Sequence, residues 1–188
     1  LLMARFGAKA YRGFYSLIAA AALVWMIHAY IGAPVVDLWT PNTAARHLSL
    51  TVMLIASILF VCGVAPPNPT LVGGGRLAAA GPVGIIKVTR HPMMWAFGLW
   101  GLTHIAAKGD AASVIFFGSL AALALVGTQL IDRRKRTSMG EAWPPFAAAT
   151  SNLPLAAIIG GRVRVGLGEI GYGRLLGGVA LYAVLLFG

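Results

Sequence analysis

The stretch that decides the fold runs from Arg90 to Asp110: Arg-His-Pro-Met-Met-Trp-Ala-Phe-Gly-Leu-Trp-Gly-Leu-Thr-His-Ile-Ala-Ala-Lys-Gly-Asp. It begins with two basic residues and Pro92, which suits the first turn of a helix because its missing N–H costs nothing there. Apolar and aromatic residues follow, with His104 near the far end. The pattern predicts an apolar helix over 92–109, and the rest of the chain is expected to hold that helix in a membrane.

The composition predicts a membrane protein. The chain has 188 residues, of which 59% are hydrophobic and 11% are charged. A soluble domain of this length cannot bury so much apolar surface, so lipid is its expected solvent. The net charge is +10, but no basic patch interleaved with aromatic residues lies on a polar element, so nucleic acid is not an expected partner. The single cysteine, Cys62, excludes an internal disulfide, and its apolar surroundings favour a packing role.

Five apolar runs predict the fold class, which is an all-α, polytopic membrane helix bundle forming one domain over residues 1–188. A spanning helix needs roughly 20 apolar residues. The expected spans lie near residues 14–31, 48–64, 92–109, 111–131 and 175–187. The chain does not open with a start methionine and a signal-type apolar core, so we expect one more segment upstream of Leu1.

The Lys and Arg residues predict the orientation of the bundle. Thirteen of them precede the first span or lie between spans two and three or four and five, whereas the other two loops hold only Arg46 and Lys108. The N-terminal segment and the loops 65–90 and 132–174 are therefore expected on the cytoplasmic side, and the C-terminus on the outer side.

The two cytoplasmic loops differ in composition. Residues 65–90 are dense in proline and glycine, which favours turns over regular structure. In the longer loop, the basic run 133–136 suits an anchor on acidic lipid. Trp143 and Phe146 suit a position at headgroup level, and residues 155–159 are expected to form a short interfacial helix.

Three histidines are expected at the outer ends of spans: His28, His47 and His104. Ionisable residues at membrane depth are functional candidates by default, and three imidazoles at one depth could meet in the bundle. Haem suits them better than zinc because it needs only one or two imidazoles in an apolar, aromatic pocket, to which Trp100 would contribute. Each histidine is also explained as a residue that caps a helix end, which for His47 is the favoured interpretation.

Arg90 and His91 place two basic side chains before a helix N-terminus, where anions bind. They could hold a phosphate, a carboxylate or a cofactor. The alternative is a loop anchor in which Arg90 bonds loop carbonyls or Glu141. His91 lies 13 residues before His104, about 20 Å along a helix, so the two cannot serve one small site.

Several motifs in chain order resemble the NnrU family of bacterial membrane proteins. They are Leu38-Trp39-Thr40-Pro41, Gly81-Pro82, Val88-Thr89-Arg90-His91-Pro92-Met93-Met94, Leu99-Trp100-Gly101-Leu102-Thr103-His104, Gly109-Asp110, Thr150-Ser151-Asn152-Leu153-Pro154 and Glu169-Ile170-Gly171. The resemblance implies a multi-pass protein of the bacterial inner membrane that is linked to nitrogen-oxide metabolism.

The NnrU family is related to zeta-carotene isomerase, a membrane haem b enzyme that isomerises a cis double bond. This relation implies a cis–trans isomerase with a lipid-soluble substrate such as a carotenoid. It also implies that His104 is an axial ligand of haem b beside Trp100. The isomerase's alternative cysteine ligand is absent, since Gly101 occupies its place. The second histidine is expected upstream of Leu1, with His28 as a substitute candidate.

Two alternatives stay open. Isoprenylcysteine and phospholipid methyltransferases also carry Arg-His-Pro, and Gly140-Glu141-Ala142-Trp143 is similar to a second element of theirs. That resemblance implies S-adenosylmethionine at Arg90 and His91, although Asp132 stands where paired glutamates are expected. The other alternative is a non-catalytic accessory subunit of a larger membrane complex, because no acidic residue falls within an expected span.

Overall fold

The structure is a computed structural model that describes residues 2–64 and 81–187, with the backbone alone for residues 2–6, 8 and 9. Its long helices are α1 (Leu2–Ile31), α2 (Thr43–Val64), α4 (Pro92–Lys108), α5 (Ala111–Met139) and α9 (Tyr172–Phe187). Short helices connect them: α3 (Ile85–Val88), η2 (Gly140–Ala142), α6 (Trp143–Ala149), α7 (Ala156–Ile159) and α8 (Leu167–Ile170). The all-α prediction is confirmed.

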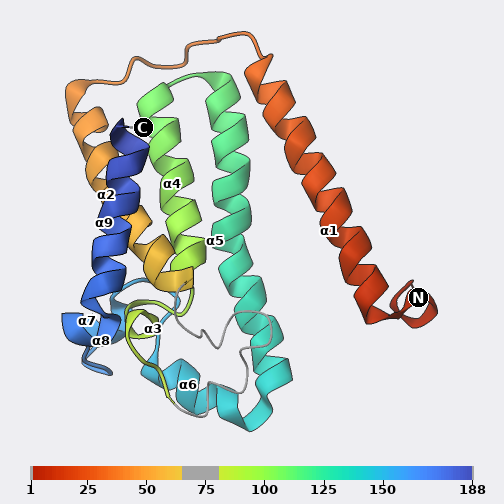
Figure 1. Ribbon diagram of the computed structural model, residues 1–188, viewed down its shortest axis with the longest axis vertical. Helices are drawn as coiled ribbons and strands as arrows, with labels where there is room; N and C mark the ends of the chain where they lie inside the picture. The colour runs from red at the N-terminus through yellow and green to blue at the C-terminus, as the bar shows by residue number, and fades with distance from the viewer. Residues whose placement is uncertain (1, 65–80, 188) are drawn as a thin grey trace.

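Four of the long helices pack into a bundle, and the fifth stands apart. Helix α4 lies between α2 and α5, and α9 packs along α2. Helix α1 leans away from this bundle and approaches α5 only near its C-terminal end (Figure 1). The short helices gather at the end of the bundle where α4 begins (Figure 1).

Three helical stretches are long and apolar enough to cross a membrane: Ala10–Ile31, Thr43–Val64 and Ala111–Ala149. Helix α9 is apolar but shorter, and its 16 residues extend about 24 Å. The chain is therefore a membrane helix bundle. The predicted count of five spans includes α4 and α9, and both of these form as helices.

The helix boundaries depart from the predicted spans mainly on α1, which begins at Leu2 and not at residue 14, and on α5. Helix α5 continues past residue 131 to Met139, so the basic run 133–136 is helical and does not belong to a loop. The predicted short helix at 155–159 forms as α7 (Ala156–Ile159). Most of the predicted proline- and glycine-rich loop, residues 65–80, lies outside the described residues.

The Lys-Gly-Asp turn between α4 and α5 is held by the segment that follows α1. Leu38 N donates to Gly109 O at 2.8 Å, and Ala111 N donates to Val36 O at 2.9 Å. Gly109 has a φ of 78°, and a Cβ there would collide with Trp39 O. Asp110 caps α5 by accepting from Ser113 N at 2.8 Å and from Ser113 Oγ at 2.6 Å. The segment after α1 and the turn between α4 and α5, which are far apart in the chain, are thus hydrogen-bonded to each other.

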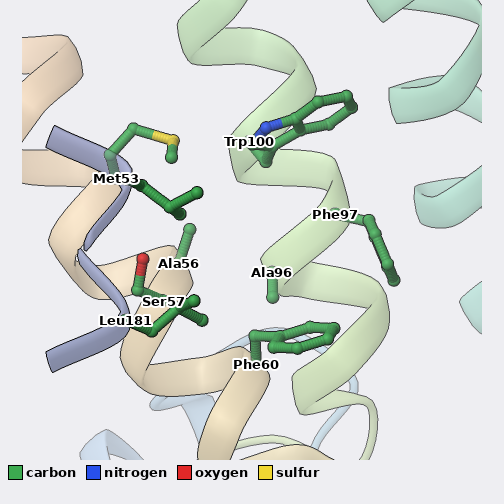
Figure 2. Close-up of a pocket in the computed structure, with 9 residues that line it drawn as sticks. Met53, Ala56, Ser57, Phe60, Ala96, Phe97, Trp100 and Leu181 are labelled. Atoms are coloured by element: carbon green, nitrogen blue, oxygen red, sulfur yellow. The ribbon is translucent and has the colours of Figure 1, made fainter. Parts of the chain in front are cut away.

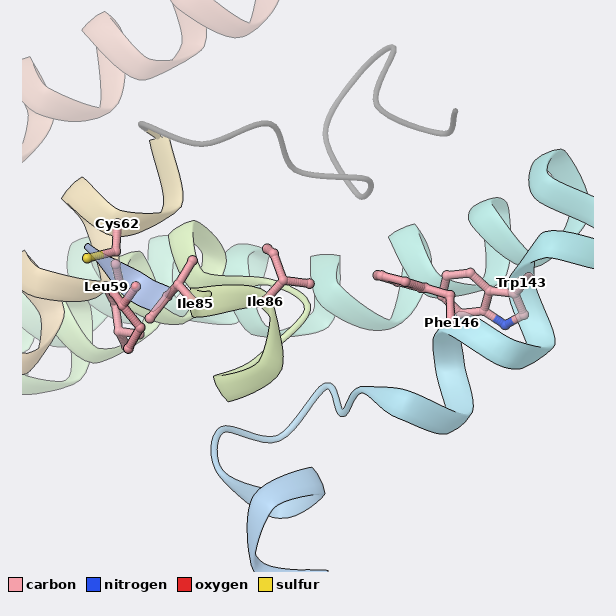
Figure 3. Close-up of a cluster of buried hydrophobic side chains, with 8 residues drawn as sticks. Leu59, Cys62, Ile85, Ile86, Trp143 and Phe146 are labelled. Carbon is pink, nitrogen blue, oxygen red and sulfur yellow. The ribbon is translucent and has the colours of Figure 1, made fainter. Parts of the chain in front are cut away.

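A compact apolar cluster closes the opposite end of the bundle (Figure 3). Trp143 and Phe146 lie in it, packed with side chains from α2 and α3, and both are buried. These two aromatic side chains therefore pack inside the protein, and their predicted headgroup depth stays a prediction. Cys62 is fully buried in the same cluster, as its predicted packing role requires. The cluster packs α6 near the start of α4 and so positions the loop that follows α6.

Candidate functional site

Arg90 and His91, which precede α4, share one carboxylate on α5. Arg90 Nη2 donates to Asp132 Oδ2 at 2.7 Å, and His91 Nε2 lies 2.7 Å from Asp132 Oδ1. The side chains of His91, Arg90 and Asp132 are 1%, 11% and 15% exposed. Buried charges are stable only when they are paired and hydrogen-bonded, so the shared carboxylate explains how two basic side chains occupy this position.

The loop after α6 completes the network. Arg90 Nη1 donates to Thr150 Oγ1 at 3.2 Å. Asn152 O accepts from Thr89 Oγ1 at 2.6 Å and from Trp95 Nε1 at 2.8 Å. We call Thr89, Arg90, His91, Asp132, Thr150 and Asn152 the Arg-His-Pro junction. Its bonds join the start of α4, the middle of α5 and the loop after α6 into one unit.

The Arg-His-Pro junction supplies its own anion. Arg90 and His91 were expected to be candidates for binding a phosphate, a carboxylate or a cofactor, and the structure places Asp132 against both of them. The alternative, a loop anchor, agrees with the bond from Arg90 Nη1 to Ala147 O at 3.3 Å. The acidic partner that the structure shows is Asp132 and not the predicted Glu141. This geometry fits a structural clamp better than a binding site.

His104 is arranged differently, on the opposite half of α4. Its Nδ1 lies 2.8 Å from Trp100 O, and because a carbonyl oxygen only accepts, Nδ1 carries the proton. In the neutral ring this leaves Nε2 with a free lone pair, and no described residue bonds to it. The ring stacks on Phe117 with centroids 4.5 Å apart, and it lies 4.9 Å from the Trp100 ring. The aromatic neighbours fix the imidazole in one orientation.

Two adjoining cavities lie between α2, α4 and α9. One, of about 210 Å³, is lined by Ser57 and Trp100 among apolar side chains (Figure 2). The other, of about 200 Å³, is lined by His104. Met53 and Leu185 line both, so we treat them as one feature, the α2–α4–α9 groove. It carries no Asp, Glu, Lys or Arg side chain among its lining residues.

The other predicted histidine ligands lie elsewhere. His28 is exposed on α1 and His47 is exposed on α2. Within residues 2–64 and 81–187, no hydrogen bond or ring contact joins either of them to His104, and no cluster of three or more His, Cys, Asp or Glu residues suits a metal ion. The three outer histidines that could have met in the bundle therefore stand apart, and His104 alone faces the groove.

The family whose description is NnrU protein matches the chain over residues 1–188. The chain belongs to the NnrU family. Curated relatives of this NnrU protein include the 15-cis-zeta-carotene isomerase of Zea mays, chloroplastic, which is 37% identical over 82 residues, 44% of this chain and 22% of that enzyme. The Arabidopsis thaliana protein of the same name is 35% identical over 79 residues, 42% of this chain and 22% of the enzyme.

The NnrU chain thus spans about a fifth of the length of the curated relatives it matches. No solved structure matches it significantly. None of these comparisons points to a methyltransferase.

Sequence analysis missed two residues that matter in this NnrU structure. Asp132 was noted only as a departure from a methyltransferase pattern, and it pairs with residues more than 40 positions earlier. Ser57 carried no signal, because one serine in an apolar run is ordinary. Its setting in the groove became visible only with the helices in place.

Proposed function

We propose that this NnrU protein is an isomerase-type membrane protein that acts on a carotenoid-like polyene in the α2–α4–α9 groove. The observation that carries the proposal is the position of His104, a fixed imidazole with a free Nε2 beside an apolar groove. The relatives named as 15-cis-zeta-carotene isomerases support a polyene as the substrate class.

The lining of the groove suits isomerisation. A cis–trans change rotates a double bond and moves no atom to or from the substrate, so it needs no acid–base pair. The titratable side chains that line the groove are His104 and Tyr182. The apolar walls would align a polyene chain and exclude water, while Phe117 and Trp100 hold the imidazole still.

A haem b held by His104 is part of the proposal. The donor fits, because an imidazole whose Nδ1 donates to a backbone carbonyl presents Nε2 to a metal in a fixed orientation. One such ligand is enough to hold a haem in many proteins. The haem would supply a redox-active iron next to the bound polyene. A second ligand, from His28 or from an upstream segment, stays a prediction.

The cellular setting is proposed from the charge pattern and the family. We place the protein in the bacterial inner membrane, with the Arg-His-Pro junction towards the cytoplasm and the C-terminus outside. In this orientation His104 lies in the outer half of the bundle. A link to nitrogen-oxide metabolism and membership of a larger membrane complex stay predictions.

The test uses the chain purified in lipid nanodiscs. The absorbance spectrum, reduced minus oxidised, is expected to show a haem Soret band, and a 15-cis carotenoid is expected to convert to its trans form. His104→Ala should remove the band and lower the conversion rate at least about 100-fold, as loss of a metal ligand does. His47→Ala is the matched control, since His47 is exposed on α2 and lines no part of the groove.

Conversion at an equal rate in the wild type and in His104→Ala would overturn the assignment of His104. Absence of conversion by the haem-loaded wild type, with a carotenoid shown to enter the disc, would overturn the isomerase itself.

A further inference from the structure

The α2–α4–α9 groove contains a hydroxyl group that lacks a partner. Ser57 is 3% exposed, and its Oγ is buried with no hydrogen bond to any described residue. A buried polar group left unpaired costs roughly 1–3 kcal/mol, so native structures rarely keep one without a reason. Ser57 is one of the residues that line the first cavity (Figure 2).

Several other hydroxyls on the helices of this chain bond to a carbonyl of their own helix. Thr51 Oγ1 donates to His47 O at 3.0 Å, and Ser119 Oγ donates to Ile115 O at 2.6 Å. This bond to the carbonyl four residues earlier is the usual one for a serine or threonine in a membrane helix. Ser57 makes no such bond and is buried, whereas Ser16 and Ser138, which also make none, are exposed.

A second donor lines the same cavity. The Trp100 indole N–H has no hydrogen bond to a described residue, and its nitrogen lies on the side of the ring that faces α2 (Figure 2). The other indole of α4, on Trp95, donates to Asn152 O at 2.8 Å. Unlike the Ser57 hydroxyl, the Trp100 nitrogen is not fully buried, since Trp100 is a half-buried residue. Two donors therefore border one apolar space that offers them no acceptor.

Ordered water does not explain this arrangement well. A buried water makes two to four hydrogen bonds, typically about three, so a water held by these two donors among apolar side chains would be at the low end of that range. A lipid ester also fits poorly, because Ser57 lies seven residues before the end of α2, about 10 Å along the helix. An acceptor oxygen carried into the bilayer interior on an apolar chain would satisfy both donors.

We propose that the α2–α4–α9 groove binds an isoprenoid polyene or prenyl chain that carries one hydroxyl or carbonyl oxygen, which accepts a hydrogen bond from Ser57. The inference deepens the proposed function and rests on it for the apolar chain. It narrows the ligand from a pure hydrocarbon to an oxygenated one. The first cavity, of about 210 Å³, would hold the oxygen beside Ser57.

The experiment compares two probes that differ in one oxygen. All-trans-retinol and axerophtene, the same polyene with the hydroxyl replaced by hydrogen, are titrated into nanodiscs that contain the haem-loaded protein, as mole fractions of the lipid. Binding is followed by quenching of tryptophan fluorescence. The wild type should bind retinol about three- to tenfold more tightly than axerophtene, as expected for one hydrogen bond.

Ser57→Ala should abolish this preference by weakening retinol binding alone. Ser57→Cys, which keeps the shape and has only a weak donor, should reduce the preference in the same direction. Ser119→Ala is the matched control, because its hydroxyl is already bonded on an exposed face of α5, and it should keep the preference. Ser57→Ala is expected to fold, since it removes an unpaired group.

Equal affinity of the wild type for the two probes would overturn the proposal, as would a preference that survives Ser57→Ala. The result is separable from the test of His104. Conversion of a 15-cis carotenoid without a retinol preference rejects the oxygenated ligand alone. A retinol preference without conversion rejects the isomerase alone.

Discussion

The two ends of α4 differ in whether the polar groups around them have hydrogen-bond partners. At its start, the Arg-His-Pro junction gives each of its side chains a partner within the protein. Further along α4, Trp100 and His104 border the α2–α4–α9 groove together with Ser57 of α2. Trp100 Nε1, His104 Nε2 and Ser57 Oγ make no hydrogen bond to a described residue. The bonds of the junction hold helices together, whereas the polar groups that border the groove are available to a ligand. Charged motif residues mark the junction, whereas the site that we propose is the groove.

The most damaging change should be at the Arg-His-Pro junction. Asp132→Ala leaves Arg90 and His91 buried without their carboxylate, and breaking a buried pair from one side costs about 3–5 kcal/mol. We expect a matching loss of unfolding free energy in a denaturant titration of the purified protein. Glu141→Ala removes an exposed acid of η2 and should stay within about 0.5 kcal/mol of the wild type. Equal losses in the two variants would contradict the role of the junction.

A smaller effect is expected where the groove depends on helix spacing. A Cβ at Gly178 on α9 would lie 2.5 Å from Ile58 Cα on α2, next to Ser57. Gly178→Ala must therefore push α9 away, which we expect to cost about 1–3 kcal/mol and to weaken retinol binding. Gly173→Ala is the control on the same helix, since a Cβ there meets nothing within 4 Å. If both variants have the stability of the wild type, the close approach is not required.

The smallest effect concerns a partly exposed ion pair just before the junction. Glu169 Oε1 lies 2.6 Å from Lys87 Nζ and accepts from Gly84 N at 3.0 Å. The hydrogen bond from Lys87 and then that from Gly84 hold the pKa of Glu169 below its usual value. The stability it contributes is therefore present above the unfolded pKa of about 4.3 and is lost as pH falls through the lower folded pKa.

The measurement is the difference in melting temperature between the wild type and Glu169→Gln at several pH values. The difference should be largest at neutral pH and should shrink below about pH 4, where the carboxylate becomes protonated. A difference that does not change with pH would show that the charge of Glu169 contributes nothing.

The sequence was sufficient to predict most of the helices, but it was insufficient to predict which residues pack against one another. Apolar runs and Pro92 predicted α2, α4 and α9 closely, because membrane length and helix-start chemistry act locally. The continuation of α5 to Met139 was missed, since a basic run is equally polar in a loop and on a helix. The burial of Trp143 was not predicted, because it depends on packing against residues distant in the chain, which no local pattern records.

The site was predictable only in part, for the same reason. His104 stood out because an imidazole is rare in an apolar helix. His28 matched it by depth, but depth along a helix says nothing about the direction of the side chain, and His28 is exposed. The roles of Asp132 and Ser57 could not be predicted, because they depend on neighbours that are distant in the chain.

The attachment of α1 has a mechanical consequence. Tyr30 OH bonds Ser113 Oγ at 3.1 Å, and Val36 and Leu38 pair with the turn around Gly109, while the window Ala10–Ile31 buries none of its residues in the described part of the protein. A rod fastened at one tip can pivot without disrupting the four-helix body. Swinging α1 would widen or close the side of α5 where Phe117, the ring that steadies His104, also meets Tyr30. A movement of α1 would therefore act on the surroundings of His104 through Tyr30 and Phe117.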